Sequence, residues 1–415
     1  MKKSMQVNRS SYLLPLAIVS ILFFVIGFGI GISGFLTPFL QDAFHLSTSQ
    51  SYLVTVAIFS AFVIFGAPAG AIIKKVGYKN GMVIAFFIMA LGMFLFIPSS
   101  KHLSFPLFLL ALFIGGIGNT VLQASVNPYV TIIGPKESAA MRMSLMGIMN
   151  KSAWWLSSLF LGIFLDLKNV KLEDVTLPFY IVTGILLALG VFMIFAPLPE
   201  VKAEGEEDDN SGVSAGDVSS KSSIFQFPHL LLGVAALFVY VGVETLPMVS
   251  IIGYAKAVFG DTARNLDSFS VYVPLGLVIG YLFGVFMIPK YMSQSTALKA
   301  FSFIGIGAAL ILILLPGELG IYAMALIGFA NSLMWPAIWP LAIADLGKFT
   351  KTGASLLVMG IVGGAVLPFI FGSIIDMVRT SEITTVANYK SAFWIYIPSY
   401  LYILFFAVKG SKIRK

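Results

Sequence analysis

Two sets of polar and aromatic side chains recur at helical spacing in this sequence and could hold a polar solute. They are Asn119, Gln123 and Asn127, and then Asn331, Trp335 and Trp339. Members of each set stand four residues apart, so on an α-helix they share one face. Amides exchange hydrogen bonds with hydroxyl groups, and indole faces cover apolar C–H surface. This chemistry suits a monosaccharide. The alternative is that the amides only join neighbouring helices and the indoles only fill space.

Two charged residues, Lys151 and Glu244, lie well inside long apolar stretches. Pro247 cannot donate a backbone hydrogen bond, so we expect it to break its helix and free carbonyl groups beside Glu244. Such a group would bind a cation or a sugar hydroxyl. The alternative is a structural ion pair between Glu244 and Lys151. Asn150 adds an amide that either lines the site or joins helices. We expect Glu244, Lys151 and Gln123 to take part in cation coupling.

The elements that position these residues are predicted to be membrane-spanning helices. The chain has 415 residues, 58% of them hydrophobic and 11% charged, whereas soluble domains carry about 25% charged residues. Its mean hydropathy is +0.94. Apolar runs of the roughly 20 residues needed to cross a bilayer recur along its length. The sequence therefore predicts an all-α polytopic membrane protein with twelve transmembrane helices, at residues 13–40, 52–73, 81–98, 105–132, 143–165, 177–196, 227–252, 269–288, 297–315, 319–344, 354–375 and 391–408.

The formal net charge is +7, but the basic residues occupy alternate loops instead of forming one patch. Lys74, Lys75 and Lys79, for example, all follow the second predicted span. This alternation indicates orientation and argues against a nucleic-acid partner. We expect a multi-pass protein of the plasma (inner) membrane with both termini in the cytoplasm. We also expect no cleaved leader, because the first apolar run is too long and continues into further spans.

The predicted spans fall into two halves. Residues 1–199 and 225–415 would each form a six-helix bundle, and residues 200–224, rich in acidic, serine and glycine residues, would form a disordered cytoplasmic linker. The two polar sets are related by the same offset of 212 residues, and this offset also relates Pro128 to Pro340. Gly66 and Gly70 are matched by glycines at 280 and 284, at the spacing that lets helices approach closely. The halves are therefore predicted to be pseudo-symmetric.

Several longer stretches resemble a known family. The loop from Gly70 to Lys79 resembles the cytoplasmic loop signature of the major facilitator superfamily, although Lys74 stands where the signature has an acidic residue. The chain as a whole resembles the branch that contains the fucose:proton symporter, and more closely the glucose/galactose transporters. The matching segments are residues 123–131, 134–135, 146–151, 225–230, 331–341 and 347–353.

The resemblance implies the major facilitator fold and uptake of a monosaccharide coupled to a cation. Two acidic residues of the symporter's pattern are replaced here by Gly34 and Gln123, so its proton-carrying pair is missing. The relatives also follow Val243 and Glu244 with another acidic residue, where this chain has Thr245. We therefore expect Na⁺ rather than H⁺ as the coupling ion, because amide and carbonyl oxygens bind Na⁺ without titrating, with a site near Glu244.

The expected function is import of a glucose- or galactose-like hexose by cation symport through alternating access. The solute would bind to Asn119, Gln123, Asn127, Asn150, Asn331, Trp335 and Trp339. Alternatives are a proton-coupled deoxyhexose or amino-sugar symporter, and a non-transporting membrane sugar sensor. An exporter of amphipathic drugs is disfavoured by the amides. Enzymatic activity is not expected, because the chain has no cysteine and its three histidines lie near span ends. We expect no cofactor apart from Na⁺. We also expect the protein to be a monomer in a lipid environment.

Overall fold

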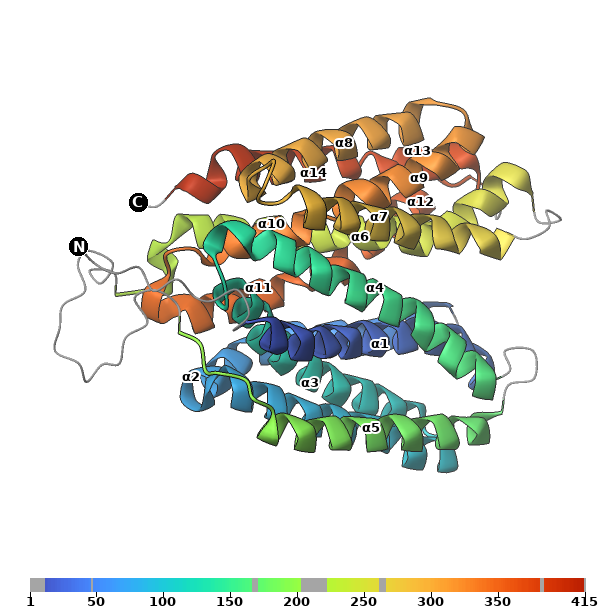
Figure 1. Cartoon of the computed structure of the whole chain (residues 1–415). Helices are drawn as coiled ribbons and strands as arrows, with labels where there is room; N and C mark the ends of the chain where they lie inside the picture. The colour runs from blue at the N-terminus through green and yellow to red at the C-terminus, as the bar shows by residue number, and fades with distance from the viewer. Residues whose placement is uncertain are drawn as a thin grey trace. The chain divides into compact units, whose positions relative to one another are not determined.

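The computed structural model describes residues 12–45, 48–165, 171–202, 222–260, 266–380 and 384–413. Over these residues the chain is built from α-helices (Figure 1). They are α1 (Leu13–Ala43), α2 (Thr48–Lys101), α3 (Phe105–Ile132), α4 (Ala139–Phe164), α5 (Thr176–Phe195), α6 (Pro228–Phe259), α7 (Tyr272–Met287), α8 (Gln294–Leu314), α9 (Gly317–Asn331), α10 (Met334–Ile343), α11 (Thr350–Gly360), α12 (Gly363–Val378), α13 (Val386–Phe393) and α14 (Tyr396–Val408). Residues 203–221 of the expected linker lie outside the described residues.

The helices account for twelve spans. Ten helical segments within the described ranges are long and apolar enough to cross a membrane. One of them, Leu53–Lys101, contains two spans, because the backbone of α2 leaves the helical conformation at Gly77. Helix α4 supplies the fifth span. Three other spans are each made of two consecutive helices, namely α9 with α10, α11 with α12, and α13 with α14.

Helix α3, which carries the first polar set, has the bounds that the sequence predicts. The Ser104 hydroxyl accepts a hydrogen bond from the Leu107 backbone N–H at 3.4 Å, and Pro106 stands in the first turn. Both features favour a helix start, since the first N–H groups of a helix have no partner within it.

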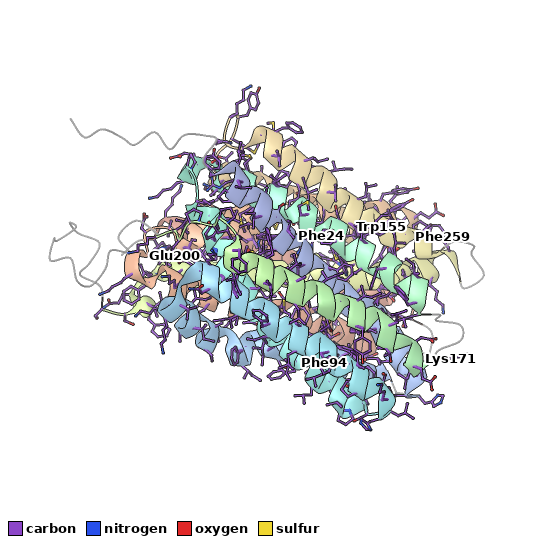
Figure 2. All side chains as sticks on the ribbon, turned by 60° about the horizontal axis from the view of Figure 1, so that its bottom comes forward. Phe24, Phe94, Trp155, Lys171, Glu200 and Phe259 are labelled. Carbon is purple, nitrogen blue, oxygen red and sulfur yellow. The ribbon has the colours of Figure 1, made fainter. Side chains whose placement is uncertain are left out.

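The surface of these helices is apolar along much of its length. Phe195 and Phe369 are 80% and 76% exposed, and Phe94 and Trp155, labelled in Figure 2, are also exposed. A water-soluble protein rarely exposes so much contiguous apolar surface, whereas lipid tails solvate it at no cost. The exposed side chains therefore face the hydrocarbon core of a bilayer.

The chain forms two compact units. Unit 1 comprises Met1–Ala139, Met149–Ser220 and Asp345–Val358, and unit 2 comprises Ala140–Ile148, Lys221–Ala344 and Met359–Lys415. The units follow the two halves of the sequence, except that the first turns of α4 belong to unit 2 and most of α11 belongs to unit 1. The predicted domain boundaries, 1–199, 200–224 and 225–415, stay a prediction.

The repeated glycines lie where helices pack closely. A Cβ atom at Gly70 would come within 2.5 Å of the Ser355 hydroxyl, and one at Gly284 would lie 2.8 Å from the Ser144 hydroxyl. A Cβ atom at Gly280 would collide with Ser332. The absence of a side chain at these three positions therefore allows the close approach that their spacing predicts.

The loop between the second and third spans is held by an acidic residue from elsewhere in the chain. The Glu200 carboxylate accepts hydrogen bonds from the backbone N–H groups of Tyr78 at 2.6 Å and Lys79 at 3.3 Å. Gly77, just before them, has φ +83°, and a Cβ atom there would meet the carboxylate at 2.7 Å. Glu200 follows the last residue of α5 and Lys171 precedes the first, so the two residues lie at opposite ends of this helix (Figure 2). An acidic residue therefore caps this helix start, although Lys74 replaces the acidic residue of the loop signature.

Two aromatic residues complete the surroundings of this cap. The Tyr129 hydroxyl donates a hydrogen bond of 2.9 Å to the carbonyl of Pro199, next to Glu200. The ammonium group of Lys351, which belongs to the same unit, lies 5.2 Å from the centre of the Tyr78 ring. The start of the expected linker is thus joined to α2 and α3.

Replacing Glu200 with alanine is expected to lower the free energy of unfolding by about 1 kcal/mol, the usual contribution of a helix cap. The physical reason is the loss of the acceptor for the Tyr78 and Lys79 N–H groups. The measurement is thermal unfolding in detergent, followed by tryptophan fluorescence. Glu137→Ala, which removes a carboxylate from an exposed position, is the control. Equal unfolding midpoints for the two variants would mean that water satisfies these N–H groups as well as Glu200 does.

Candidate functional site

The three amides of α3 lie in one buried row. Asn119 is 5% exposed, Gln123 4% and Asn127 0%. The Gln123 side-chain N–H donates to Asn119 Oδ1 at 3.1 Å, and the Asn127 side-chain N–H donates to the Gln123 backbone carbonyl at 3.0 Å. Asn127 Oδ1 is buried and has no hydrogen-bond partner in the described part of the chain. The row thus uses part of its hydrogen-bonding capacity within α3 and leaves one buried acceptor unsatisfied.

The second set does not lie on one continuous helix, contrary to the sequence expectation. Helix α9 ends at Asn331. Helix α10, which carries the two indoles, begins at Met334. Pro336 explains the interruption, because it has no N–H to donate to the carbonyl four residues earlier, at Ser332. The repeat of α3 in the second half is therefore two short helices, and Asn331 stands at the end of the first.

Asn331 is a bridge between three helices of unit 2. Its side-chain N–H donates to the backbone carbonyl of Val243 in α6 at 3.1 Å. Its Oδ1 accepts a hydrogen bond of 3.0 Å from the Tyr400 hydroxyl in α14. Both Asn331 and Tyr400 are completely buried. Asn331 therefore joins helices here, which is the alternative role that the sequence left open.

Pro247 explains why the Val243 carbonyl is available. In an α-helix this carbonyl would accept from the N–H of residue 247, which proline lacks. The expectation that Pro247 breaks its helix is wrong, because α6 runs unbroken from Pro228 to Phe259. The carbonyl is freed as predicted, but Asn331 binds it, which compensates for the missing backbone bond.

The two tryptophans form an aromatic group with Tyr240 of α6. The ring centroids of Trp335 and Trp339 are 5.6 Å apart, and those of Tyr240 and Trp335 are 6.2 Å apart. Trp339 is completely buried, and its Nε1–H has no hydrogen-bond partner among the described residues. Trp335 is only partly buried. The group therefore offers a partly accessible ring face and an unsatisfied buried donor.

Glu244 lies among tyrosines that the sequence analysis missed. It is 9% exposed, and its carboxyl group interacts electrostatically with the hydroxyls of Tyr240, Tyr281 and Tyr400. Tyr240 could have been found from its position one turn before Glu244 on the same helix. Tyr281 of α7 and Tyr400 of α14 could not, because only the packing of helices brings them to α6.

Lys151 and Asn150 lie on the part of α4 that belongs to unit 1. The Lys151 ammonium group lies 5.6 Å from the centre of the Trp154 ring, one turn further along the helix. Asn150 donates a hydrogen bond of 3.3 Å to the Phe23 carbonyl in α1, so it joins two helices. Pairing of Lys151 with Glu244 stays a prediction.

The structure thus gathers the predicted residues in two groups. Asn119, Gln123, Asn127, Asn150 and Lys151 belong to unit 1, and Glu244, Asn331, Trp335 and Trp339 belong to unit 2. Their roles in binding a solute or an ion stay predictions.

The fold is that of a polytopic membrane protein, and the comparison with known families agrees. The model of the Major Facilitator Superfamily matches residues 19–368, and the chain belongs to this family. The relatives of this chain are transporters and not enzymes.

Similar proteins narrow the comparison. The chain is 30% identical to the glucose/galactose transporter of Brucella abortus biovar 1 (strain 9-941), over 98% of this chain and 96% of the relative. It is 28% identical to the L-fucose-proton symporter of Escherichia coli (strain K12), over 88% of each chain. A crystal structure of the transporter FucP in the outward conformation superposes with a TM-score of 0.81 and 26% identity, covering 95% of this chain and 98% of FucP. The family resemblance predicted from the sequence is confirmed.

A double-mutant cycle tests the bridge made by Asn331. Asn331→Leu leaves the Val243 carbonyl and the Tyr400 hydroxyl without their partner, and we expect it to cost about 1–2 kcal/mol of unfolding free energy. In a Pro247→Ala background, residue 247 regains an N–H that can donate to Val243, so the same change should cost about half as much. Unfolding in detergent with increasing denaturant measures both costs. The same cost in both backgrounds would contradict this account of Pro247.

Proposed function

We propose that this chain imports a monosaccharide, a hexose of the glucose or galactose type, by symport with a cation through alternating access. The names of its relatives support this solute class. The observation that carries the proposal is the pair of unsatisfied buried polar atoms, Asn127 Oδ1 and Trp339 Nε1, in the two repeated sets. A buried polar atom without a partner costs free energy, and a bound hydroxyl group would remove that cost.

In this proposal the amide row and the aromatic group bind different parts of a sugar. Asn119, Gln123 and Asn127 supply donors and acceptors for hydroxyl groups, and the partly accessible face of Trp335 covers the apolar face of a pyranose ring. Asn150 and Asn331 are already bonded to backbone carbonyls, so we propose that they hold the helices that carry the site.

Coupling to a cation supplies the driving force. One symported positive charge gains about 2.3 kcal/mol per 100 mV of membrane potential. At ~1.4 kcal/mol per decade, this is roughly a fifty-fold accumulation of solute. We propose that Glu244 is the ion-binding residue, with Na⁺ as the ion favoured by the amide-rich sequence. The distribution of basic residues favours a plasma (inner) membrane protein with both termini in the cytoplasm.

A second candidate solute is a deoxyhexose, because one relative is a symporter of L-fucose and protons. A non-transporting sugar sensor is the third. One measurement, the exchange of labelled sugar across a membrane, distinguishes both candidates from the first proposal.

Purified protein in proteoliposomes is expected to exchange internal unlabelled D-galactose or D-glucose for the labelled external sugar. The screen includes L-fucose and an amino sugar, and each is tested with and without Na⁺. Exchange of L-fucose alone would support the second candidate. Binding of a sugar without exchange would support the sensor, and exchange of none of these sugars would overturn the proposal.

Gln123→Ala and Trp335→Ala are each expected to weaken sugar binding about tenfold or more, because one removes hydrogen bonds and the other removes the ring platform. Affinity is measured by isothermal titration in detergent. Ser125→Ala is the matched control on α3, since that hydroxyl bonds to the Val121 carbonyl and faces α2 at Gly81. Trp155→Ala is the control for an indole, because Trp155 is 57% exposed. Wild-type affinity in both test variants would remove these residues from the site.

A further inference from the structure

The span made of α11 and α12 is interrupted by Ile361 and Val362. The Val362 N–H donates a hydrogen bond of 3.3 Å to the Met359 carbonyl. The Gly364 N–H donates one of 3.0 Å to the Ile361 carbonyl. Each bond reaches the third residue back, as in a 3₁₀ turn, and a 3₁₀ turn within a longer helix often marks a hinge. The backbone here is therefore hydrogen-bonded but leaves the α-helical pattern.

The residues around this interruption favour bending. Gly360 and Gly363 flank it, Gly364 follows, and Pro368 stands one turn further along α12. Glycine loses more backbone freedom in a helix than any other residue, so it weakens a helix that passes through it. Pro368 has no N–H to donate to the Gly364 carbonyl, four residues earlier. The sequence thus makes a continuous helix unfavourable over residues 360–368.

The equivalent span of the first half has no such interruption. The tripeptide Met-Gly-Ile at residues 146–148 returns at residues 359–361, an offset of 213. At this offset α4 has Asn150 and Lys151 where α12 begins with two glycines, and Trp155 where α12 has its proline. Helix α4 passes through these positions without a break. The contrast between the two copies of the repeat indicates that the glycines and the proline cause the interruption.

The interruption also lies where the chain passes from one compact unit to the other. Unit 1 includes the chain up to Val358, and unit 2 resumes at Met359. The other two interrupted spans in the described part of the chain, α9 with α10 and α13 with α14, lie wholly in unit 2. Two hydrogen bonds of Asn331 hold the first of these, and the stacked rings of Phe393 and Tyr396, 5.9 Å apart, cross the second. The break between α11 and α12 is therefore the one that combines a unit boundary with a weak helix.

Helix α12 is fixed to α6 within unit 2. A Cβ atom at Gly363 would collide with the backbone carbonyl of Phe238, and one at Gly242 would collide with the Leu367 side chain. The first turns of α12 therefore lie directly on the backbone of α6. Because packed backbones leave no space between them, we expect α12 and α6 to move as one body.

Helix α11 is held differently, by contacts within unit 1. The Ser355 hydroxyl lies against Gly70 of α2, where a Cβ atom would come within 2.5 Å of it. The same hydroxyl donates a hydrogen bond of 2.8 Å to the Thr352 carbonyl of its own helix. If α11 separated from α2, this hydroxyl would keep its partner, so the separation would leave no unpaired donor there. The contact is therefore suited to repeated breaking and re-forming.

We propose that Ile361 and Val362 form a hinge at which α11 tilts relative to α12 in each transport cycle. Helix α12 stays on α6, and α11 moves toward or away from α2, which closes or opens the cytoplasmic end of the path in the proposed orientation. This inference rests on the proposed function, because it names a moving element of alternating access. It also distinguishes the two halves of the chain, since α4 has no hinge at the equivalent place.

Hydrogen–deuterium exchange of the full-length protein in detergent tests the hinge without any solute. The amides of residues 361–366 should have protection factors about tenfold or more lower than those of residues 148–153, the equivalent stretch of α4, because local opening is easiest where the helix is weakest. Mass spectrometry of overlapping peptides measures both stretches. Equal protection of the two would overturn the proposal.

Spin labels test the motion, and the chain is suited to them because it has no cysteine. One pair, Leu231→Cys with Thr352→Cys, joins α6 to α11. A second pair, Val249→Cys with Phe369→Cys, joins α6 to α12, and a third, Lys75→Cys with Leu231→Cys, joins the two units. Thr352 is half-buried and the other four positions are exposed. Distances are measured by double electron–electron resonance in lipid nanodiscs, with and without D-galactose.

The distance between α6 and α11 should change by about 5 Å with the sugar, because Thr352 lies about 14 Å from the hinge at ~1.5 Å per residue and a kink of about 20° would form or straighten. The distance between α6 and α12 should stay constant. A change between the units at a constant distance from α6 to α11 would show that the span moves as one rigid body, and would overturn the proposal. A constant distance between the units would instead contradict the proposed solute, and hydrogen exchange would then decide the hinge.

A stiffened hinge provides the functional test. Val362→Ala combined with Pro368→Ala favours a continuous helix, because alanine has the highest helix propensity and residue 368 regains an N–H. Both changes remove atoms, so neither creates an overlap. The double variant should exchange labelled D-galactose about fivefold or more slowly, with its sugar affinity in isothermal titration unchanged. Val366→Ala, at another half-buried valine of α12, is the matched control. Exchange at the wild-type rate in the double variant would exclude a role for the hinge in transport and overturn the proposal.

Discussion

Lipid offers no hydrogen bonds, so every polar group that this chain places within the bilayer must find its partner inside the protein. The bond between Asn331 and the Val243 carbonyl meets this requirement at the point where Pro247 removes the normal backbone donor. Asn331 also accepts a hydrogen bond from the Tyr400 hydroxyl. The two hydrogen bonds of Asn331 therefore connect α9 to α6 and to α14. Helix α6 remains unbroken past its proline, and Glu244 is held at a fixed place on it.

The same requirement separates the polar groups whose hydrogen bonds join helices from those that keep a buried polar atom without a partner in the described structure. The side-chain N–H groups of Asn150 and Asn331 donate hydrogen bonds to backbone carbonyls. Asn127 and Trp339 each keep a buried atom unsatisfied. Buried polar side chains of this chain therefore differ in how far their hydrogen bonds are satisfied. The repeat preserves the positions of the side chains, but each unit sets the partners that those side chains meet.

Much of the fold could be predicted from the sequence, because a bilayer imposes a length and a composition on every span. Helix α3 has the predicted bounds, and the row of Asn119, Gln123 and Asn127 follows directly from its spacing. The interruption between α9 and α10 was not predicted, because the four-residue spacing of Asn331, Trp335 and Trp339 is also that of a continuous helix. The continuity of α6 was missed for the opposite reason. A proline was expected to end a helix, but a side chain 84 residues away replaces its lost hydrogen bond.

Contacts between distant parts of the chain account for the rest of what sequence reasoning missed. Glu200 caps a helix that begins 122 residues earlier, and nothing in the local sequence of either segment indicates that pairing. Tyr281 and Tyr400 likewise come near Glu244 only through the packing of α7 and α14 against α6. Tyr281 and Tyr400 stand in apolar stretches, where a tyrosine usually indicates only packing.

The tryptophan pair has an optical consequence. Two indoles whose centres are 5.6 Å apart, with planes tilted by 48°, are close enough for their electronic transitions to couple, and the tilt gives that coupling a handedness. The chain has five tryptophans in total. This coupled pair should therefore contribute its own signal to the circular dichroism of an unlabelled sample, and that signal depends on the geometry of α10.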